Sequence, residues 1–246
     1  MAAMATLDRS VREIVADDFR AAAVFERFGI DFCCGGRRTL AEACRDREVS
    51  PVEVLNEMIE ACERQNETVP RFTRWSVDAL VAYIVRHHHA YVRRVLPSMV
   101  VHTRKVAASH GGGHPELEEI AAIFEEVAEE MTAHMMKEEE ILFPYIEQLE
   151  LARRLREPVP AAALGSVEKP IAMIEHEHEH AGLAMARIRE LSRGYALPQG
   201  ACTTYVACFR ELEEFEQDLH VHVHLENNVL FPKAHALAAG AAAGTS

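Results

Sequence analysis

The chain has 246 residues, of which 49% are hydrophobic and 26% are charged, a composition that excludes an intrinsically disordered chain and a collagen-like fibre. Its formal net charge of −13 repels phosphate groups, so we expect no nucleic acid and no membrane surface as a partner. No apolar run reaches the roughly 20 residues that span a bilayer, and the first residues lack the features of a signal peptide, so we expect a cytoplasmic protein.

Apolar residues recur at intervals of three and four almost everywhere, and this pattern predicts an all-α protein. Residues 1–66 are predicted to form a small helical domain that carries cysteines. Its first helix is expected over about residues 17–28 and ends at Gly29, because glycine tolerates a left-handed backbone. Residues 39–42 and 50–53 both fit capping boxes, which predict the starts of two more helices. A polar stretch over residues 67–75 is predicted to be a linker.

The string Asp31-Phe-Cys-Cys-Gly-Gly36 places two thiols, Cys33 and Cys34, side by side. A disulfide between them is disfavoured because it needs Cα atoms about 5.5 Å apart, whereas neighbouring Cα atoms are held at about 3.8 Å. We therefore expect the two cysteines to act on an external group, as metal ligands or as redox or transfer thiols. The adjacent Arg37 and Arg38 are expected to favour the thiolate. The alternative is two small buried residues at a turn between helices.

Four long helical patterns follow, separated by segments rich in glycine and proline. They cover about residues 76–109, 115–148, 166–192 and 203–233. Four long helices with short links predict an up-down-up-down four-helix bundle over residues 76–236. The last residues, 237–246, are expected to be a flexible tail.

The second and fourth of these helices repeat one string. Both contain a histidine, a glutamate four residues later, and then an apolar residue followed by Leu-Phe-Pro: His134 with Glu138, and His222 with Glu226. Each pair replaces apolar residues within the apolar stripe of its helix, so these side chains are predicted to face the core. A buried, unpaired carboxylate is costly and two facing glutamates repel each other, so the expected partner is a multivalent metal.

The expected inward stripes also supply a ligand from each of the other two helices. In chain order the stripes contain Ala82, Val85, His89, Val92 and Leu96; Ile120, Phe124, Val127, Met131, His134, Glu138, Ile141 and Tyr145; Ile171, Ile174, His178, Ala181, Met185 and Ile188; and Leu212, Phe215, Leu219, His222, Glu226 and Val229. They select His89 from a run of three histidines and His178 from three that alternate with glutamates. Pro144 and Pro232 are expected to end or kink their helices.

The predicted metal ligands are four imidazoles and two carboxylates at one level of the bundle: His89, His134, Glu138, His178, His222 and Glu226. Two metal ions, each bound by two imidazoles and sharing both carboxylates, would use every ligand. Ligation by nitrogen and oxygen without thiolate suits iron or manganese, with zinc possible.

The remaining candidates near these ligands are assigned other places. His110 lies about 30 Å from the level of His89 along a straight helix and stays outside the primary set unless a bend brings it in. Glu139 is expected on a solvated face. The neighbouring histidines are expected on solvated faces, or at most as hydrogen-bond donors behind the ligands: His87, His88, His176, His180, His220 and His224.

Three strings together resemble the iron-sulfur cluster repair family, also described as repair-of-iron-centres proteins. They are residues 31–36, His134-Met-Met-Lys-Glu-Glu139 followed by Ile-Leu-Phe-Pro144, and Leu225-Glu-Asn-Asn-Val-Leu-Phe-Pro232. The resemblance implies a short cysteine-bearing domain joined to a hemerythrin-like bundle, with two iron ions and an oxo or hydroxo bridge on the six residues named above.

The same resemblance implies a function. It implies a cytoplasmic homodimer that restores iron-sulfur clusters damaged by nitric oxide or peroxide. Damaged iron-sulfur proteins are then the partners, and Cys33 and Cys34 correspond to the cysteine pair of the family.

Two other functions fit these residues. One is a carrier or sensor that binds dioxygen or nitric oxide reversibly, with a small domain that only transmits a signal or dimerises. The other is an enzyme that reduces nitric oxide at the di-iron site. A ferritin-like oxidase is disfavoured, because that arrangement uses Glu-x-x-His on two helices, whereas here the histidine precedes the glutamate.

Overall fold

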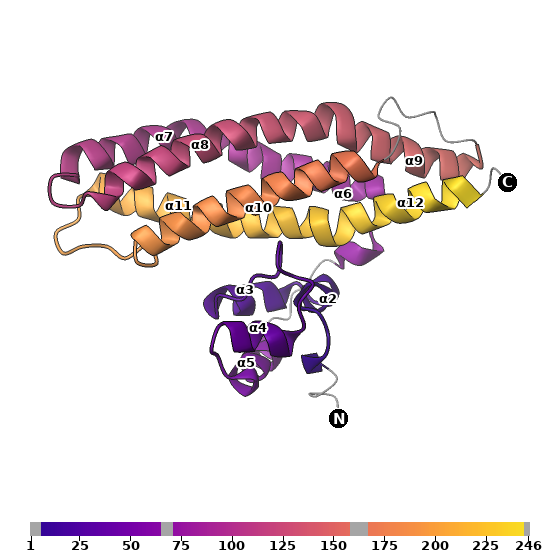
Figure 1. Ribbon diagram of the computed structural model, residues 1–246, viewed down its shortest axis with the longest axis horizontal. Helices are drawn as coiled ribbons and strands as arrows, with labels where there is room; N and C mark the ends of the chain where they lie inside the picture. The colour runs from indigo at the N-terminus through magenta and orange to yellow at the C-terminus, as the bar shows by residue number, and fades with distance from the viewer. Residues whose placement is uncertain (1–5, 65–70, 158–166, 244–246) are drawn as a thin grey trace.

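A computed structural model describes residues 6–64, 71–157 and 167–243. Over these ranges the chain is helical, with one isolated bridge between Ser10 and Thr39, so the predicted all-α fold is confirmed. Figure 1 shows a long four-helix bundle with the small N-terminal domain packed beneath its middle. No described helix combines the length and apolar character needed to cross a membrane.

The described part of the N-terminal domain includes the short helices α2 (Val11–Asp17), α3 (Arg20–Arg27), α4 (Leu40–Asp46) and α5 (Pro51–Arg64). The predicted capping box before α4 is present, because Glu42 N donates to Thr39 Oγ1 at 3.2 Å and Thr39 N donates to Glu42 Oε2 at 2.9 Å. Gly29 has a φ of +64° after α3, as its predicted role requires. Helix α2 was not expected, although Ser10 N donates to Glu13 Oε2 at 3.2 Å in the same N-terminal pattern.

The bundle is built from four helical runs, three of which are interrupted. They are α6 (Val77–Ile84), η2 (Val85–His89) and α7 (Ala90–His110); α8 (Glu116–Lys137), η3 (Glu138–Leu142) and α9 (Phe143–Leu155); α10 (Glu168–Leu191); and α11 (Thr203–Leu225), η4 (Glu226–Leu230) and α12 (Phe231–Ala243). The interruptions η2, η3 and η4 are single turns of π-helix.

Each π-turn inserts one extra residue and changes which side chains face inward. Within η3 the buried residue is Leu142, while Ile141 is 49% exposed. Before η2 the buried residue is Ile84, and Val85 is only half-buried. The predicted stripe was therefore wrong at Ala82, Val85, Ile141 and Tyr145. Helix α10 has no π-turn, and all six residues predicted for its stripe are buried.

The two Leu-Phe-Pro strings continue their helices instead of ending them. Pro144 and Pro232 are the second residues of α9 and α12, directly after the π-turns. A proline in the first turn of a helix removes no hydrogen bond that the helix needs. The expected helix end at these prolines was wrong for this reason.

Two segments expected to be irregular contain helix among their described residues. The predicted linker contains the short helix η1 (Phe72–Arg74), in which Phe72 is buried against Trp75 and Tyr83. The predicted tail from residue 237 is helical as far as Ala243, because Leu237 packs into the core and the alanines that follow favour helix.

The apolar core of the bundle is divided into two clusters by a polar layer. One cluster fills the half near the α7–α8 hairpin and includes the core of the N-terminal domain. The other fills the opposite half around Phe72, Leu80 and Phe231. In every helical run, the predicted metal ligands lie between the two clusters.

Candidate metal centre

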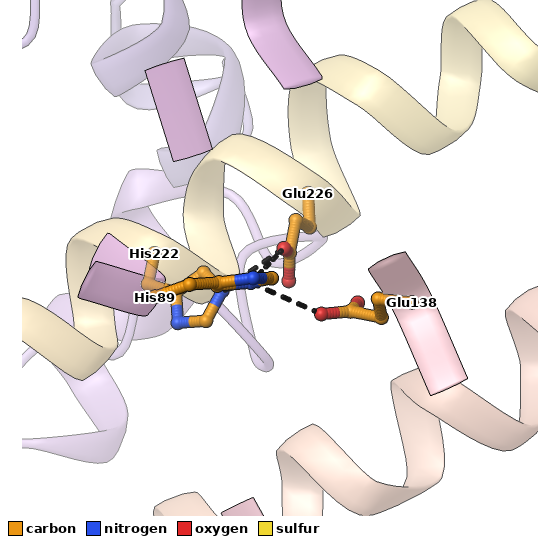
Figure 2. A group of neighbouring side chains, drawn as sticks. All are labelled: His89, Glu138, His222 and Glu226. Carbon is orange, nitrogen blue, oxygen red and sulfur yellow. Dashed lines mark hydrogen bonds and ion pairs between the residues drawn. The ribbon is translucent and has the colours of Figure 1, made fainter. Parts of the chain in front are cut away.

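The polar layer contains all six predicted ligands, and their side chains are at most 2% exposed. His134 lies on α8, His178 on α10 and His222 on α11. His89 ends η2, Glu138 begins η3 and Glu226 begins η4. Figure 2 shows His89, His222 and the two glutamates pointing toward one another from three helical runs.

The six side chains form two groups that share both glutamates. His89 Nε2 lies 3.0 Å from His222 Nε2, and His178 Nε2 lies 3.1 Å from His134 Nε2. Glu226 bridges the pairs, with Oε1 at 2.9 Å from His222 Nε2 and Oε2 at 3.0 Å from His178 Nε2. Glu138 Oε2 lies 3.3 Å from both His89 Nε2 and His134 Nε2. In each group of four, the candidate ligand atoms are within 4.8 Å of one another.

This arrangement fits metal ions because its lone pairs converge. The Nδ1 atoms of three imidazoles contact outer acceptors, which leaves their Nε2 atoms as lone-pair donors toward the centre: His89, His134 and His178. Among the described residues, no group donates a hydrogen bond of normal geometry to either oxygen of Glu138 or to Glu226 Oε2. Buried carboxylate oxygens in this position need a cation.

The pKa shifts show the same demand for positive charge. Burial disfavours a charged imidazole, but contacts with Glu138 and Glu226 outweigh it and raise the pKa of His89 to about 10. For His134 burial is likewise outweighed, mainly by Glu138, and the pKa rises to about 9. Burial lowers the pKa of His222. The neighbouring imidazoles hold the pKa of Glu226 well below its ordinary range despite its burial. The site therefore stabilises two anionic carboxylates and attracts either protons or metal ions.

The repeated string supplies more than the glutamates. The residue after each glutamate binds an imidazole of the neighbouring run: Glu139 Oε1 lies 2.6 Å from His89 Nδ1, and Asn227 Oδ1 lies 2.8 Å from His178 Nδ1. The phenylalanine of each string stacks on the same imidazole, Phe143 on His89 and Phe231 on His178. The repeat therefore encodes a pseudo-two-fold support for the centre.

Three supporting residues were missed by the sequence reasoning: Glu139, Glu177 and Asn227. Glu139 is only 25% exposed and also pairs with Arg93, so its expected solvated position was wrong. Glu177 Oε2 lies 3.0 Å from His134 Nδ1, and Lys137 contacts the other oxygen. Each of these residues adjoins a predicted ligand in the sequence, which was the available signal.

Two of the remaining histidines contradict their expected solvated positions. His88 is 5% exposed, stacks on His222, and has Nδ1 at 2.9 Å from Asp218 Oδ1. His224 is 1% exposed and contacts Asn228. His224 is covered by Phe19 and Phe32 of the N-terminal domain, and His88 is covered by Tyr83 and His222 within the bundle. His87, His176 and His180 are exposed as expected, and His220 is partly covered beside Glu26.

His110 lies outside the centre. It ends α7 at the hairpin end of the bundle, and its Nε2 is 3.3 Å from Cys202 Sγ.

The loop that carries Cys33 and Cys34 packs directly against the bundle. Asp31 Oδ1 accepts hydrogen bonds at 3.0 Å from both cysteine backbone nitrogens. Asn228, next to Asn227 in η4, donates to the carbonyl oxygens of Phe32 at 3.2 Å and Cys33 at 3.1 Å. The loop is therefore fixed to the π-turn that begins with Glu226.

The two thiols differ in their surroundings. Their sulfur atoms are 3.9 Å apart, so no disulfide joins them. Cys33 is buried, and its hydrogen bond to Cys34 together with burial raises its pKa well above the ordinary value. The expected thiolate was therefore wrong for Cys33. Cys34 is half-buried and faces α10 at Gly182, where an added Cβ would lie 3.8 Å from Cys34 Sγ.

Comparison with known proteins gives matches over both parts of the chain. Residues 7–62 match a family described as "Domain of Unknown function (DUF542)", and residues 80–234 match the "Hemerythrin HHE cation binding domain". A protein of Pectobacterium atrosepticum named "Iron-sulfur cluster repair protein YtfE" is 34% identical over 235 residues, 94% of this chain and 98% of its own. A protein of the same name from Edwardsiella ictaluri is 36% identical over 92% of this chain and 96% of its own length. Another from Yersinia pseudotuberculosis is 32% identical over 87% of this chain and 91% of its own length.

Proposed function

Because this chain belongs to the YtfE family of iron-sulfur cluster repair proteins, we propose that it repairs damaged iron-sulfur clusters by means of a di-iron centre in its bundle. The observation that carries this proposal is the pair of four-residue groups that share Glu138 and Glu226. Two ions placed in these groups would each take two imidazoles, and both would share the two carboxylates.

The donor set is compatible with iron as the metal. Imidazole and carboxylate without thiolate suit iron and manganese, and the order of metal affinities alone does not choose between them. The family supplies the choice of iron. When bound, iron at these positions would supply electron exchange and the reversible binding of a diatomic molecule such as nitric oxide or dioxygen.

The protein residues have two roles in this proposal. Glu139, Glu177 and Asn227 hold three imidazoles with Nε2 directed inward, and the apolar clusters on either side keep water from the layer. Cys33 and Cys34 are the proposed transfer thiols toward a damaged iron-sulfur protein, because Asn228 fixes their loop beside Glu226.

The test compares iron content and repair in matched variants. Anaerobically purified protein should contain about two irons per chain with a coupled di-iron Mössbauer spectrum. It should restore activity to an iron-sulfur enzyme inactivated by nitric oxide. Glu138→Leu with Glu226→Leu should lose both properties, while Glu129→Leu with Glu140→Leu, at two exposed positions of the same run, should keep both.

Two results would refute the proposal. A protein that repairs the enzyme equally well without iron would exclude the centre from the function. Full repair by the Cys33→Ser, Cys34→Ser double variant would exclude the thiols.

A further inference from the structure

A cleft of about 670 Å³ lies where the N-terminal domain meets the bundle. None of the six centre residues lines it, whereas Cys33 and Cys34 both do. One side is formed by the N-terminal domain and the other by α10 and η4. Its volume falls within the range of roughly 300–1,000 Å³ that is typical of sites for small molecules.

The two sides of the cleft differ in net charge. On the N-terminal side four arginines outnumber two acids, Glu26 and Asp31. On the α10 side two glutamates outnumber Arg189, which contacts Glu216 at 3.7 Å. On the N-terminal side Arg12, Arg37 and Arg47 make no ion pair with a described residue, while Arg38 is paired with Asp46 at 2.6 Å. Three such arginines are notable in a chain with a formal charge of −13. An unpaired guanidinium in a cleft is a ready partner for a carboxylate.

The opposite side of the cleft carries carboxylates from α10. Glu175 has no ion pair among the described residues, and Glu179 has only a long contact of 3.9 Å with His176. These carboxylates are placed to accept an ammonium group. A ligand that satisfies both sides is therefore zwitterionic, with more than one carboxylate.

The thiols between these two sides are arranged so that one of them faces a ligand. Cys33 is 7% exposed, and its Sγ lies 3.3 Å from Asp31 Oδ1 and 3.9 Å from Cys34 Sγ. Cys34 is the hydrogen-bond acceptor in this pair and is the more exposed thiol. Cys34 is therefore the thiol that a ligand in the cleft can reach.

We propose that this cleft binds the disulfide of a low-molecular-weight thiol that bears carboxylates and an ammonium group, and that Cys34 undergoes thiol–disulfide exchange with it. The Cys34 sulfur attacks one sulfur of the ligand's disulfide, forms a mixed disulfide, and breaks the ligand's S–S bond. The departing half takes the electron pair of that bond and the proton that Cys34 loses, and leaves as a thiol. A second molecule of the thiol reverses the step and restores Cys34 and the free disulfide.

Because of its position next to Cys34, Cys33 does not resolve the mixed disulfide, which persists until a second molecule of the small thiol attacks it. A disulfide between adjacent residues is geometrically disfavoured, so Cys33 does not readily displace the bound half. The cleft thereby provides a reversible cap for Cys34. This inference goes beyond cluster repair and does not depend on iron chemistry.

The test uses oxidised glutathione as the zwitterionic probe and cystamine as a cationic disulfide without carboxylates. The metal-loaded full chain is treated with each probe, and mixed-disulfide formation at each cysteine is followed by mass spectrometry of peptides. Cys202 serves as the internal reference, because it is exposed and lies at the hairpin end of the bundle, outside the cleft. Cys34 should react faster than Cys202 with oxidised glutathione, and this preference should be absent with cystamine.

Matched arginine variants separate recognition by the cleft from general charge. Arg37→Gln with Arg47→Gln should lower the Cys34 rate with oxidised glutathione about fivefold, and the effect should shrink at high salt. Arg71→Gln with Arg153→Gln removes the same charge at exposed positions outside the cleft and should leave the rate unchanged. Cys33→Ser should still form the mixed disulfide at Cys34.

Two outcomes would overturn the proposal. One is a ratio of the Cys34 rate to the Cys202 rate that is the same with oxidised glutathione and with cystamine. The other is an unchanged Cys34 rate with oxidised glutathione in the Arg37→Gln, Arg47→Gln variant. Because iron content and repair are not read in this experiment, its failure is distinct from a failure of the proposed function.

Discussion

Glu177→Ala tests whether the residues behind the ligands set metal affinity. Glu177 is not a predicted ligand, but it is 3.0 Å from His134 Nδ1 and is also held by Lys137. Its removal leaves His134 without its outer acceptor, so the ring can rotate and its Nε2 is less fixed toward the centre. Loss of such a partner lowers metal affinity about 10- to 100-fold in other metal sites.

The structure places the expected effect at the lower end of this range. A hydrogen bond to a charged group contributes about 1.5–3 kcal/mol when buried. Glu177 is 27% exposed and shares its charge with Lys137, so we expect a loss of about 1.4 kcal/mol, which is about tenfold in the dissociation constant.

The assay is an anaerobic competition for ferrous iron between the protein and a coloured chelator. Glu177→Gln keeps an acceptor oxygen and should recover most of the affinity. Glu179→Ala removes an exposed carboxylate from the same helix and should have no effect. Affinity within twofold of the parent for Glu177→Ala, or an equal loss for Glu179→Ala, would refute the reasoning.

Three more predictions follow from the centre and its supports. In the metal-free protein the pKa values of His89 and His134 are raised to about 10 and 9. The two protonated imidazoles therefore contribute to stability in full below the unfolded pKa of about 6.5, and this contribution is lost as the pH rises through 9 to 10. Denaturant unfolding of metal-free protein should show this decline, and iron affinity should rise with pH because the metal displaces these protons; flat profiles would contradict both. Leu142→Ala should cost about 2–5 kcal/mol in denaturant unfolding and Ile141→Ala less than about 1 kcal/mol, because the π-turn buries Leu142; equal costs would contradict the register. Gly182→Ala should leave the alkylation rate of Cys34 unchanged, because the added Cβ would lie at an ordinary 3.8 Å from Cys34 Sγ. Gly182→Leu should displace the cysteine loop and raise that rate. An unchanged rate for Gly182→Leu would show that the loop does not rest on α10.

Much of the fold could be predicted from apolar spacing alone. Helix α10 follows a regular α-helical pattern, and its six inward residues, including His178, were identified in full. The other three runs contain π-turns at the centre, and no local feature of a sequence announces an extra residue in one turn. The predicted faces therefore failed at Val85, which begins η2, and at Ile141, which lies in η3, but held for His134 and His222, which precede η3 and η4.

The candidate site was predicted better than its surroundings. A repeated histidine and glutamate at matched offsets is a direct signal, because two helices that carry it must present it at one level. The roles of Glu177, Asn228 and His88 depend on which helices become neighbours, and spacing within one helix does not contain that information. The cleft beside Cys34 depends in the same way on how the N-terminal domain docks.

Anomalous X-ray scattering at the iron absorption edge, from crystals grown anaerobically, tests the two-ion arrangement most directly. The account predicts two iron peaks within the polar layer, one between His89 and His222 and the other between His134 and His178, with Glu138 and Glu226 contacting both. A single peak, or iron bound at Cys33 and Cys34 instead, would contradict it.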